Sequence, residues 1–274
     1  MKLLIYTDLD DSLLDHETYS FRESKPALDI IRERKIPLIF VTSKTRTEVE
    51  QLQNEMGFSD PFIVENGAAV YFPLDYMGFS INNGSRQQGY TVIRLGAEYA
   101  GIRRFVESVK DRFKICGFGD MEPGYISKVA GLSEGQAIMA KQREFSEPFV
   151  IKDESLMSKL VDMAESEGFK ITRGGRFFHL TGNSQDKGRA IKITTEIYSE
   201  NMNEKFISIG IGDSPNDISM LKRVNIPVLI PHADGSYEDL HVNHLRRALL
   251  PGSKGWNQIM IEILSHTFQE HLYE

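Results

Sequence analysis

The sequence contains almost no cysteine and no long apolar run. Cys116 is the only cysteine among 274 residues, so no disulfide can form within the chain and a reducing compartment such as the cytoplasm is expected. No apolar stretch approaches the ~20 residues that a membrane-spanning helix needs. Asp8 also comes too early to leave room for the apolar region of a signal peptide. These absences predict a soluble cytoplasmic protein with no membrane partner.

Positive charge is scarce as well. The chain has 32 Lys and Arg against 39 Asp and Glu, a net charge of −7, and no basic run interleaved with aromatic residues. Nucleic-acid binding depends on basic surfaces that neutralise phosphates, so this balance argues against a nucleic-acid partner. Hydrophobic residues make up 41% of the chain and charged residues 26%, as in ordinary globular proteins. The length predicts one large domain or two modest ones.

Strand and helix patterns alternate near both ends of the chain. Continuous apolar runs, typical of parallel strands buried on both faces, lie at residues 3–6, 36–41 and 206–212. The segment "PFIVENGAAVYF" predicts two strands joined by a hairpin at Asn66-Gly67. Helical periodicity follows Pro26, a possible Thr45–Glu48 capping box and Lys187. This alternation predicts an α/β fold with a Rossmann-like parallel-sheet core.

The middle of the chain differs in composition from the two ends. Polar and glycine-bearing residues at 82–89 predict a linker, and several strand and helix patterns follow it. The strands are expected at residues 91–95, 114–118, 143–151 and within "FKITRGGRFFHLTG", and the longer helices at 97–112 and 155–167. We therefore predict an inserted α/β domain at residues 83–185, within a catalytic core domain formed by 1–82 and 186–274.

Polar side chains follow three of the apolar runs. Asp8, Asp10 and Asp11 follow the first run, Ser43 the second and Asp213 the third. In open parallel sheets ligands bind outside the carboxyl ends of the strands, so neighbouring strands would bring these groups into one site. Clustered carboxylates resist burial unless they are paired or bind a metal, and Mg²⁺ prefers hard oxygen ligands. The pattern predicts a Mg²⁺ site, to which Lys187 could contribute.

Each motif alone has a simpler interpretation. "DLDDS" could be a solvated turn and "GDSPND" an ordinary loop. Ser43 alone would be a helix cap, and Lys187 alone a surface lysine. Their order along the chain, each at a strand end or a helix start, favours a common site.

Taken together these motifs resemble those of the haloacid-dehalogenase phosphatase superfamily. The matching residues are "DLDDS", Ser43, Lys187 and "GDSPND". The finer pattern "TSKTR", "ENGA", "REFSE", "GGRFFHL" and "DKGRA" is similar to the mannosyl-3-phosphoglycerate phosphatase family, whose members carry a large α/β cap. The resemblance covers nearly the whole chain.

The resemblance implies a role for each core residue. Asp8 would attack phosphorus and form an aspartyl-phosphate, while Asp10 would transfer the proton of the leaving oxygen and then activate water. Ser43 and Lys187 would hold the phosphoryl oxygens. Mg²⁺ would lie between Asp8, the backbone carbonyl of Asp10 and Asp213, with Asp217 either binding the ion or holding its ligands. Asp11 departs from the superfamily, in which glycine is common at this position.

The resemblance also implies substrate contacts and a substrate. The expected contacts are Lys44, Glu65, Asn66, Arg143, Arg176 and His179; for the last three a solvated or purely structural role remains open. Mannosyl-3-phosphoglycerate is the predicted substrate. The alternatives are the glucosyl analogue, a broader range of sugar phosphates, a phosphomutase reaction, and a non-catalytic binding module. A pure binder would need neither a nucleophile nor an acid, so Asp8 and Asp10 argue against the last.

Overall fold

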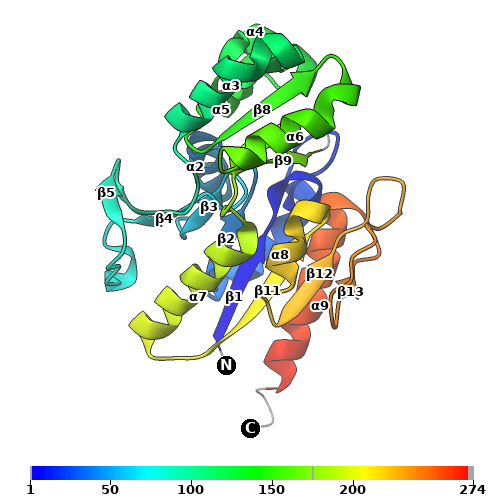
Figure 1. The fold of residues 1–274 in the computed structure, drawn as a ribbon. Coiled ribbons are helices and arrows are strands. Elements are labelled where there is room, and N and C mark those ends of the chain that lie inside the picture. Colours follow the sequence, from blue (N-terminus) through cyan, green and yellow to red (C-terminus); the bar gives the residue numbers. More distant parts are fainter. Residues whose placement is uncertain (1, 175, 271–274) are drawn as a thin grey trace.

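The computed structural model describes residues 2–174 and 176–270, and two sheets organise this part of the chain (Figure 1). The larger sheet has the strand order β13-β12-β11-β1-β2-β3-β4-β6-β5, and the smaller one the order β7-β8-β10-β9. The smaller sheet and its helices, which we call the inserted unit, lie above the larger sheet in the view of Figure 1. In the described residues no helix combines the length and apolar character needed to cross a bilayer.

The larger sheet and its helices form the core, and the inserted unit has strands and helices of its own. The core contains β1 (Lys2–Thr7), α1 (Lys25–Glu33), β2 (Leu38–Val41), α2 (Arg46–Met56), β3 (Phe62–Val64), β4 (Ala69–Pro73), β5 (Ser85–Gln87), β6 (Tyr90–Arg94), α7 (Lys187–Met202), β11 (Phe206–Gly212), α8 (Ile218–Leu221), β12 (Ile226–Leu229), β13 (Arg246–Arg247) and α9 (Gly252–Glu270). The inserted unit contains α3 (Tyr99–Phe113), β7 (Ile115–Gly117), α4 (Pro123–Ala130), α5 (Glu134–Ala140), β8 (Ser146–Ile151), α6 (Met157–Ser166), β9 (Phe169–Arg173) and β10 (Phe178–Gly182).

The core sheet is parallel from β13 through β3 and antiparallel from β4 to β5. Its central strands are largely apolar because helices cover both faces of the sheet. One core cluster joins the sheet to α1, α2 and α9, and includes Ile31, Val49 and the fully buried Trp256. The other joins the opposite face to α7 and α8, and includes Ile191 and Met220. The predicted α/β class with an inserted unit is confirmed.

Local sequence signals predicted several element boundaries. Pro26 lies in the first turn of α1, and the Thr45–Glu48 capping box is formed at the start of α2. The β3–β4 hairpin turns through Glu65, Asn66 and Gly67, all with positive φ. A Cβ at Gly67 would lie 2.2 Å from the carbonyl oxygen of Asp186, so only glycine lets this turn approach the start of α7.

The linker predicted at residues 82–89 is wrong. β5 occupies residues 85–87 and pairs with β6, and both strands belong to the core sheet, so the predicted boundary at residue 83 falls before the end of that sheet. β5 resembles a loop in composition because it is a sheet edge with largely exposed side chains. Gln88 and Gly89 both have positive φ, which suits a tight hairpin turn between the two strands.

Candidate active site

The carboxyl ends of β11, β1 and β2 lie side by side in the core sheet. Asp8 follows β1, Asp213 follows β11, and Ser43 lies two residues beyond β2. The sequence-based expectation that these three strands are neighbours is therefore confirmed. The register brings segments that are far apart in the sequence to the same carboxyl-terminal side of the sheet, where their side chains can converge.

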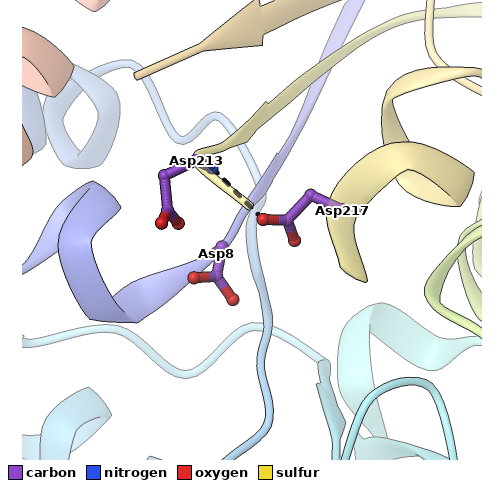
Figure 2. A group of neighbouring side chains, drawn as sticks. All are labelled: Asp8, Asp213 and Asp217. Atoms are coloured by element: carbon purple, nitrogen blue, oxygen red, sulfur yellow. Dashed lines mark hydrogen bonds between the residues drawn. The ribbon is translucent and has the colours of Figure 1, made fainter. Parts of the chain in front are cut away.

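Three buried carboxylates converge at this edge (Figure 2). One oxygen each from Asp8, Asp213 and Asp217 lies within 4.8 Å of the others. The backbone N–H of Asp213 donates to Asp217 Oδ2 at 3.2 Å, the contact dashed in Figure 2. Ser12 Oγ donates to Asp213 Oδ1 at 3.1 Å. These bonds fix the orientation of two carboxylates while the third stands at the end of β1.

A single lysine is paired with this cluster. Lys187 Nζ lies 2.6 Å from Asp8 Oδ1 and 2.7 Å from Asp217 Oδ1, and its side chain is fully buried. Burial raises the pKa of Asp8 to about 7, and the charge of Lys187 only partly offsets this. Burial, together with the charges of Asp217 and Asp8, also raises the pKa of Asp213 well above its usual value. If all three carboxylates were ionised, they would carry more negative charge than Lys187 can balance, and the raised pKa values reflect this.

This donor set fits a metal ion. Three carboxylates with one lysine leave an excess of hard, anionic oxygen, which a small divalent cation would neutralise. Asp8, Asp213 and Asp217 are the residues that could hold it. A bound cation would favour the ionised carboxylates and so reverse the rise in the pKa of Asp8.

Asp10 lies apart from the three clustered carboxylates. Its Oδ1 forms an ion pair with Lys44 Nζ at 2.8 Å, and both side chains are partly buried. Burial opposes the charge on Lys44, but Asp10 and Glu48 outweigh it and raise the pKa of the ammonium group. Asp11 adopts the left-handed conformation, with φ 57°, and pairs with His16 Nδ1 at 2.7 Å. Aspartate tolerates this conformation better than most residues, so the turn does not require glycine at this position.

Arg143 connects the inserted unit to the Ser43 segment. Its Nη1 donates to the carbonyl oxygen of Ser43 at 2.7 Å, and its side chain is 6% exposed. Thr45 Oγ1 in turn donates to the carbonyl oxygen of Met139 in α5 at 3.0 Å. Asn216 Nδ2, from the segment between Asp213 and Asp217, donates to Asn66 Oδ1 at 3.4 Å. Arg143 therefore adjoins the predicted catalytic residue Ser43, and Asn66 adjoins the segment that carries the predicted metal ligands Asp213 and Asp217.

The other predicted substrate contacts are placed differently. Both oxygens of the buried Glu65 accept hydrogen bonds from the inserted unit, from the N–H groups of Glu144 and Phe145 and from Ser146 Oγ. Arg176 is exposed and donates to the carbonyl oxygen of Ala130 at the end of α4. Glu65 thus ties the two parts of the molecule together, and Arg176 is held within the inserted unit.

His179 lies on β10, partly buried. Its Nδ1 has no hydrogen-bond partner among the described residues. Burial, and secondarily the charge of Arg143, lower the pKa of His179 to about 4, so its imidazole is neutral at physiological pH. It can accept or donate one hydrogen bond, but it offers no positive charge to a substrate.

Sequence reasoning missed three supporting residues. Trp256 Nε1, from α9, donates to Thr7 Oγ1 at 2.9 Å, and Thr7 Oγ1 donates to the carbonyl oxygen of Asp8 at 2.7 Å. Ser12 holds Asp213 from within the first motif. Ser12 could have been found, because its hydroxyl directly follows the aspartates. No local signal links Trp256 to Asp8, since 248 residues separate them.

Comparisons with known proteins identify the family of the chain. A model of haloacid dehalogenase-like hydrolases matches residues 5–95. A "Glucosyl-3-phosphoglycerate/mannosyl-3-phosphoglycerate phosphatase" of Persephonella marina is 50% identical over 263 residues, 96% of this chain and 97% of the relative. A "Mannosyl-3-phosphoglycerate phosphatase" of Pyrococcus furiosus is 32% identical over 228 residues, 83% of this chain and 90% of that one.

Solved structures show the same fold. A crystal structure of a Thermoplasma acidophilum protein has a TM-score of 0.68 and 19% identity, covering 96% of this chain and 98% of that one. The chain belongs to the haloacid dehalogenase-like hydrolases, and among them it is a phosphoric monoester hydrolase.

Proposed function

We propose that the protein is a Mg²⁺-dependent phosphatase that converts mannosyl-3-phosphoglycerate to mannosylglycerate and phosphate. The observation that carries this proposal is the buried cluster of Asp8, Asp213, Asp217 and Lys187, in a chain 50% identical to the Persephonella marina phosphatase. The name of that relative includes the glucosyl ester as well, so glucosyl-3-phosphoglycerate is the second candidate substrate.

Asp8 is the nucleophile of the proposed reaction. It attacks phosphorus, the bond to the leaving oxygen breaks, and an aspartyl-phosphate forms on its carboxylate. Lys187, 2.6 Å from Asp8, neutralises charge on the phosphoryl oxygens as they approach, and Ser43 donates to them from the end of β2. A bound Mg²⁺ would supply the further positive charge that lets an anionic phosphate approach three carboxylates. Asp8, the Asp10 backbone carbonyl and Asp213 would hold the ion, with Asp217 beside them.

Asp10 moves the protons. It protonates the oxygen of the departing alcohol and then takes a proton from the water that hydrolyses the aspartyl-phosphate. The ion pair with Lys44 at 2.8 Å holds the Asp10 carboxylate in place. The inserted unit covers the site and limits the access of water during the first step.

A 3-phosphoglycerate ester carries a carboxylate in addition to its phosphate. Two cations stand next to the site besides Lys187, and both approach Glu48: Lys44 Nζ lies 4.0 Å from Glu48 Oε1, and Arg143 Nη2 lies 4.0 Å from Glu48 Oε2. We assign recognition of the glycerate carboxylate to Lys44 and Arg143, with His179 and Asn66 as neutral polar contacts.

Phosphate release by the purified protein tests the proposal. The panel contains the mannosyl and glucosyl esters, other sugar phosphates and p-nitrophenyl phosphate, each with Mg²⁺ and with excess EDTA. We expect the mannosyl ester to have the highest kcat/KM and EDTA to abolish every activity until Mg²⁺ is restored. Full activity after exhaustive chelation would rule out the metal, and equal activity on all sugar phosphates would rule out the assigned substrate.

A further inference from the structure

A cleft of about 120 Å³ opens between the core and the inserted unit. Its walls come from the Leu14–Tyr19 loop, from α2 and from α5. Lys44 belongs both to this lining and to the active site, because its Nζ forms the ion pair with Asp10 at 2.8 Å. The cleft therefore adjoins the group that protonates the leaving oxygen, rather than the Asp8–Lys187 side that receives the phosphoryl group.

The lining has the mixed chemistry of a small-molecule site. Leu52 and Met139 are apolar, Tyr19 presents an aromatic ring, and Gln51 and Gln136 carry amide groups. Clefts that bind small ligands combine apolar contact area with a few polar groups that fix orientation. A sugar has matching features, since hydroxyl groups surround a ring whose C–H faces pack on aromatic side chains.

Local hydrogen bonds order the loop that carries Tyr19. Asp15 Oδ1 accepts from the N–H of Thr18 at 3.0 Å and from its hydroxyl at 2.7 Å, and Tyr19 N–H donates to the carbonyl oxygen of Asp15 at 3.0 Å. Tyr19 itself has φ 54°, a conformation that is costly for a bulky residue and persists where surrounding contacts impose it. These contacts hold its ring 5.6 Å from Lys44 Nζ.

We propose that this cleft receives the leaving group of the ester, with the glycerate at Lys44 and the hexose ring between Tyr19 and the amides of Gln51 and Gln136. The inference rests on the proposed function. It follows from the direction of the reaction: the alcohol oxygen must lie at Asp10 to be protonated, and the space beyond Asp10 and Lys44 is the cleft. The contact between α2 and α5 makes the core and the inserted unit jointly responsible for the choice of sugar.

The test fills the cleft at an exposed position. Gln51→Trp places an indole in the cleft from the surface of α2. Asn54→Trp, at another exposed position of the same helix that does not line the cleft, is the matched control. Steady-state kinetics compare the mannosyl and glucosyl esters with p-nitrophenyl phosphate, which has no glycerate or hexose. We expect Gln51→Trp to raise KM for the esters roughly 10-fold or more, as expected for lost ligand contacts, with a far smaller change for p-nitrophenyl phosphate. Asn54→Trp should match the wild type on every substrate.

Product inhibition gives an independent measurement. Mannosylglycerate should inhibit hydrolysis of p-nitrophenyl phosphate competitively, and Gln51→Trp should raise its inhibition constant by the same factor as KM. Tyr19→Ala removes the aromatic ring from the lining of the cleft and should also raise KM for the esters. This variant replaces Gln51→Trp in the experiment if Gln51→Trp does not fold.

The outcomes separate the two proposals. If the wild type releases phosphate from neither ester, the proposed function fails, and this inference fails with it. If instead the wild type is active on an ester, the cleft variants decide the inference alone. It is overturned if they leave the KM for that ester unchanged, or if they lower the activity on all substrates equally.

Discussion

Lys187 Nζ lies 2.6 Å from Asp8 Oδ1, and the lysine side chain has no exposed surface. The partner carboxylates are themselves buried, so this lysine has two roles: it neutralises the phosphoryl oxygens in the proposed reaction, and it stabilises the fold around the carboxylates. Removing it would leave several buried carboxylates without a cation.

Lys187→Met should therefore lose both activity and stability. Breaking a buried ion pair from one side typically costs about 3–5 kcal/mol, and we expect a loss of this order in the free energy of unfolding, measured by urea denaturation in EDTA. Lys192→Met, which changes an exposed lysine of the same helix, should alter stability by less than about 0.5 kcal/mol. Equal stability of the two variants would contradict the assigned role.

The raised pKa of Asp8 predicts a pH dependence of stability. The carboxyl has a pKa of about 7 in the folded, metal-free protein and 3.8 when unperturbed, so between these values the folded state holds a proton that the unfolded chain has released. Stability contributed by this group therefore falls as the pH rises from about 4 to about 7. Asp8→Asn lacks the ionisable group. In EDTA, the free energy of unfolding of the variant should therefore rise relative to that of the wild type between about pH 4 and pH 7. Urea denaturation at pH 4 and pH 7 measures this difference in the free energy of unfolding. If the difference between the variant and the wild type is the same at both pH values, the pKa of Asp8 is not raised.

The Asp8→Asn variant also tests the chemistry. An amide is a poor nucleophile, so no turnover is expected with any substrate. Asp10→Asn should instead be slowed on the order of 10²- to 10⁴-fold on the esters, and it should accumulate phosphoenzyme with p-nitrophenyl phosphate, whose leaving group needs no proton. Turnover at the wild-type rate in Asp8→Asn would require a different nucleophile.

Glu65 should stabilise the backbone of residues 144–146 at the start of β8, because its carboxylate accepts hydrogen bonds from all three. Glu65→Ala would leave the buried N–H of Phe145, and the N–H of Glu144, without their acceptor, at a cost of about 1–3 kcal/mol each. We expect faster hydrogen exchange at residues 144–146 and lower stability, with Glu65→Gln intermediate because it keeps one acceptor oxygen. Glu33→Ala, at an exposed position of α1, serves as the control. If hydrogen exchange at residues 144–146 is unchanged in Glu65→Ala, the hydrogen bonds of Glu65 do not stabilise this segment.

The two candidate arginines should behave differently. Arg143→Lys loses the planar fork beside Ser43 and should lower kcat/KM for the mannosyl ester roughly 10- to 150-fold, with a much smaller loss on p-nitrophenyl phosphate. Arg176→Lys should change neither, because its side chain is exposed and bonded to Ala130. If Arg143→Lys lowers both activities equally, Arg143 acts by holding Ser43 and not by binding glycerate.

The sequence was enough to predict that the carboxyl ends of β11, β1 and β2 lie together. Asp8, Ser43 and Asp213 each end a recognisable apolar run, and the rule that ligands bind at strand carboxyl ends was enough to group them. The environment of Glu65 and Arg176 depends on how the inserted unit packs on the core, which no local pattern encodes. Both were expected to contact the substrate, yet the side chain of Glu65 is bonded to residues 144–146 and that of Arg176 to Ala130.

The errors in the fold have similar causes. β5 was predicted to be a linker because an edge strand with exposed side chains has the composition of a loop. The capping box at Thr45 and the turn at Asn66-Gly67 were predicted well, because backbone geometry at those positions depends on the residues themselves. The bond from Trp256 to Thr7 could not be predicted, since it joins opposite ends of the chain.

The chain leaves the core sheet and returns to it through two segments in direct contact. Ser184 Oγ donates to the carbonyl oxygen of Leu95 at 3.3 Å, and Gly96 packs so tightly on Gln185 that a Cβ there would lie 2.5 Å from its Oε1. An insertion whose ends meet can be lengthened, shortened or replaced without moving the strands that carry Asp8 and Asp213. Evolution could thus have given one hydrolytic centre new substrates by exchanging what lies between residues 96 and 185, and the same junction is where a chimaera between two members of the family should be cut.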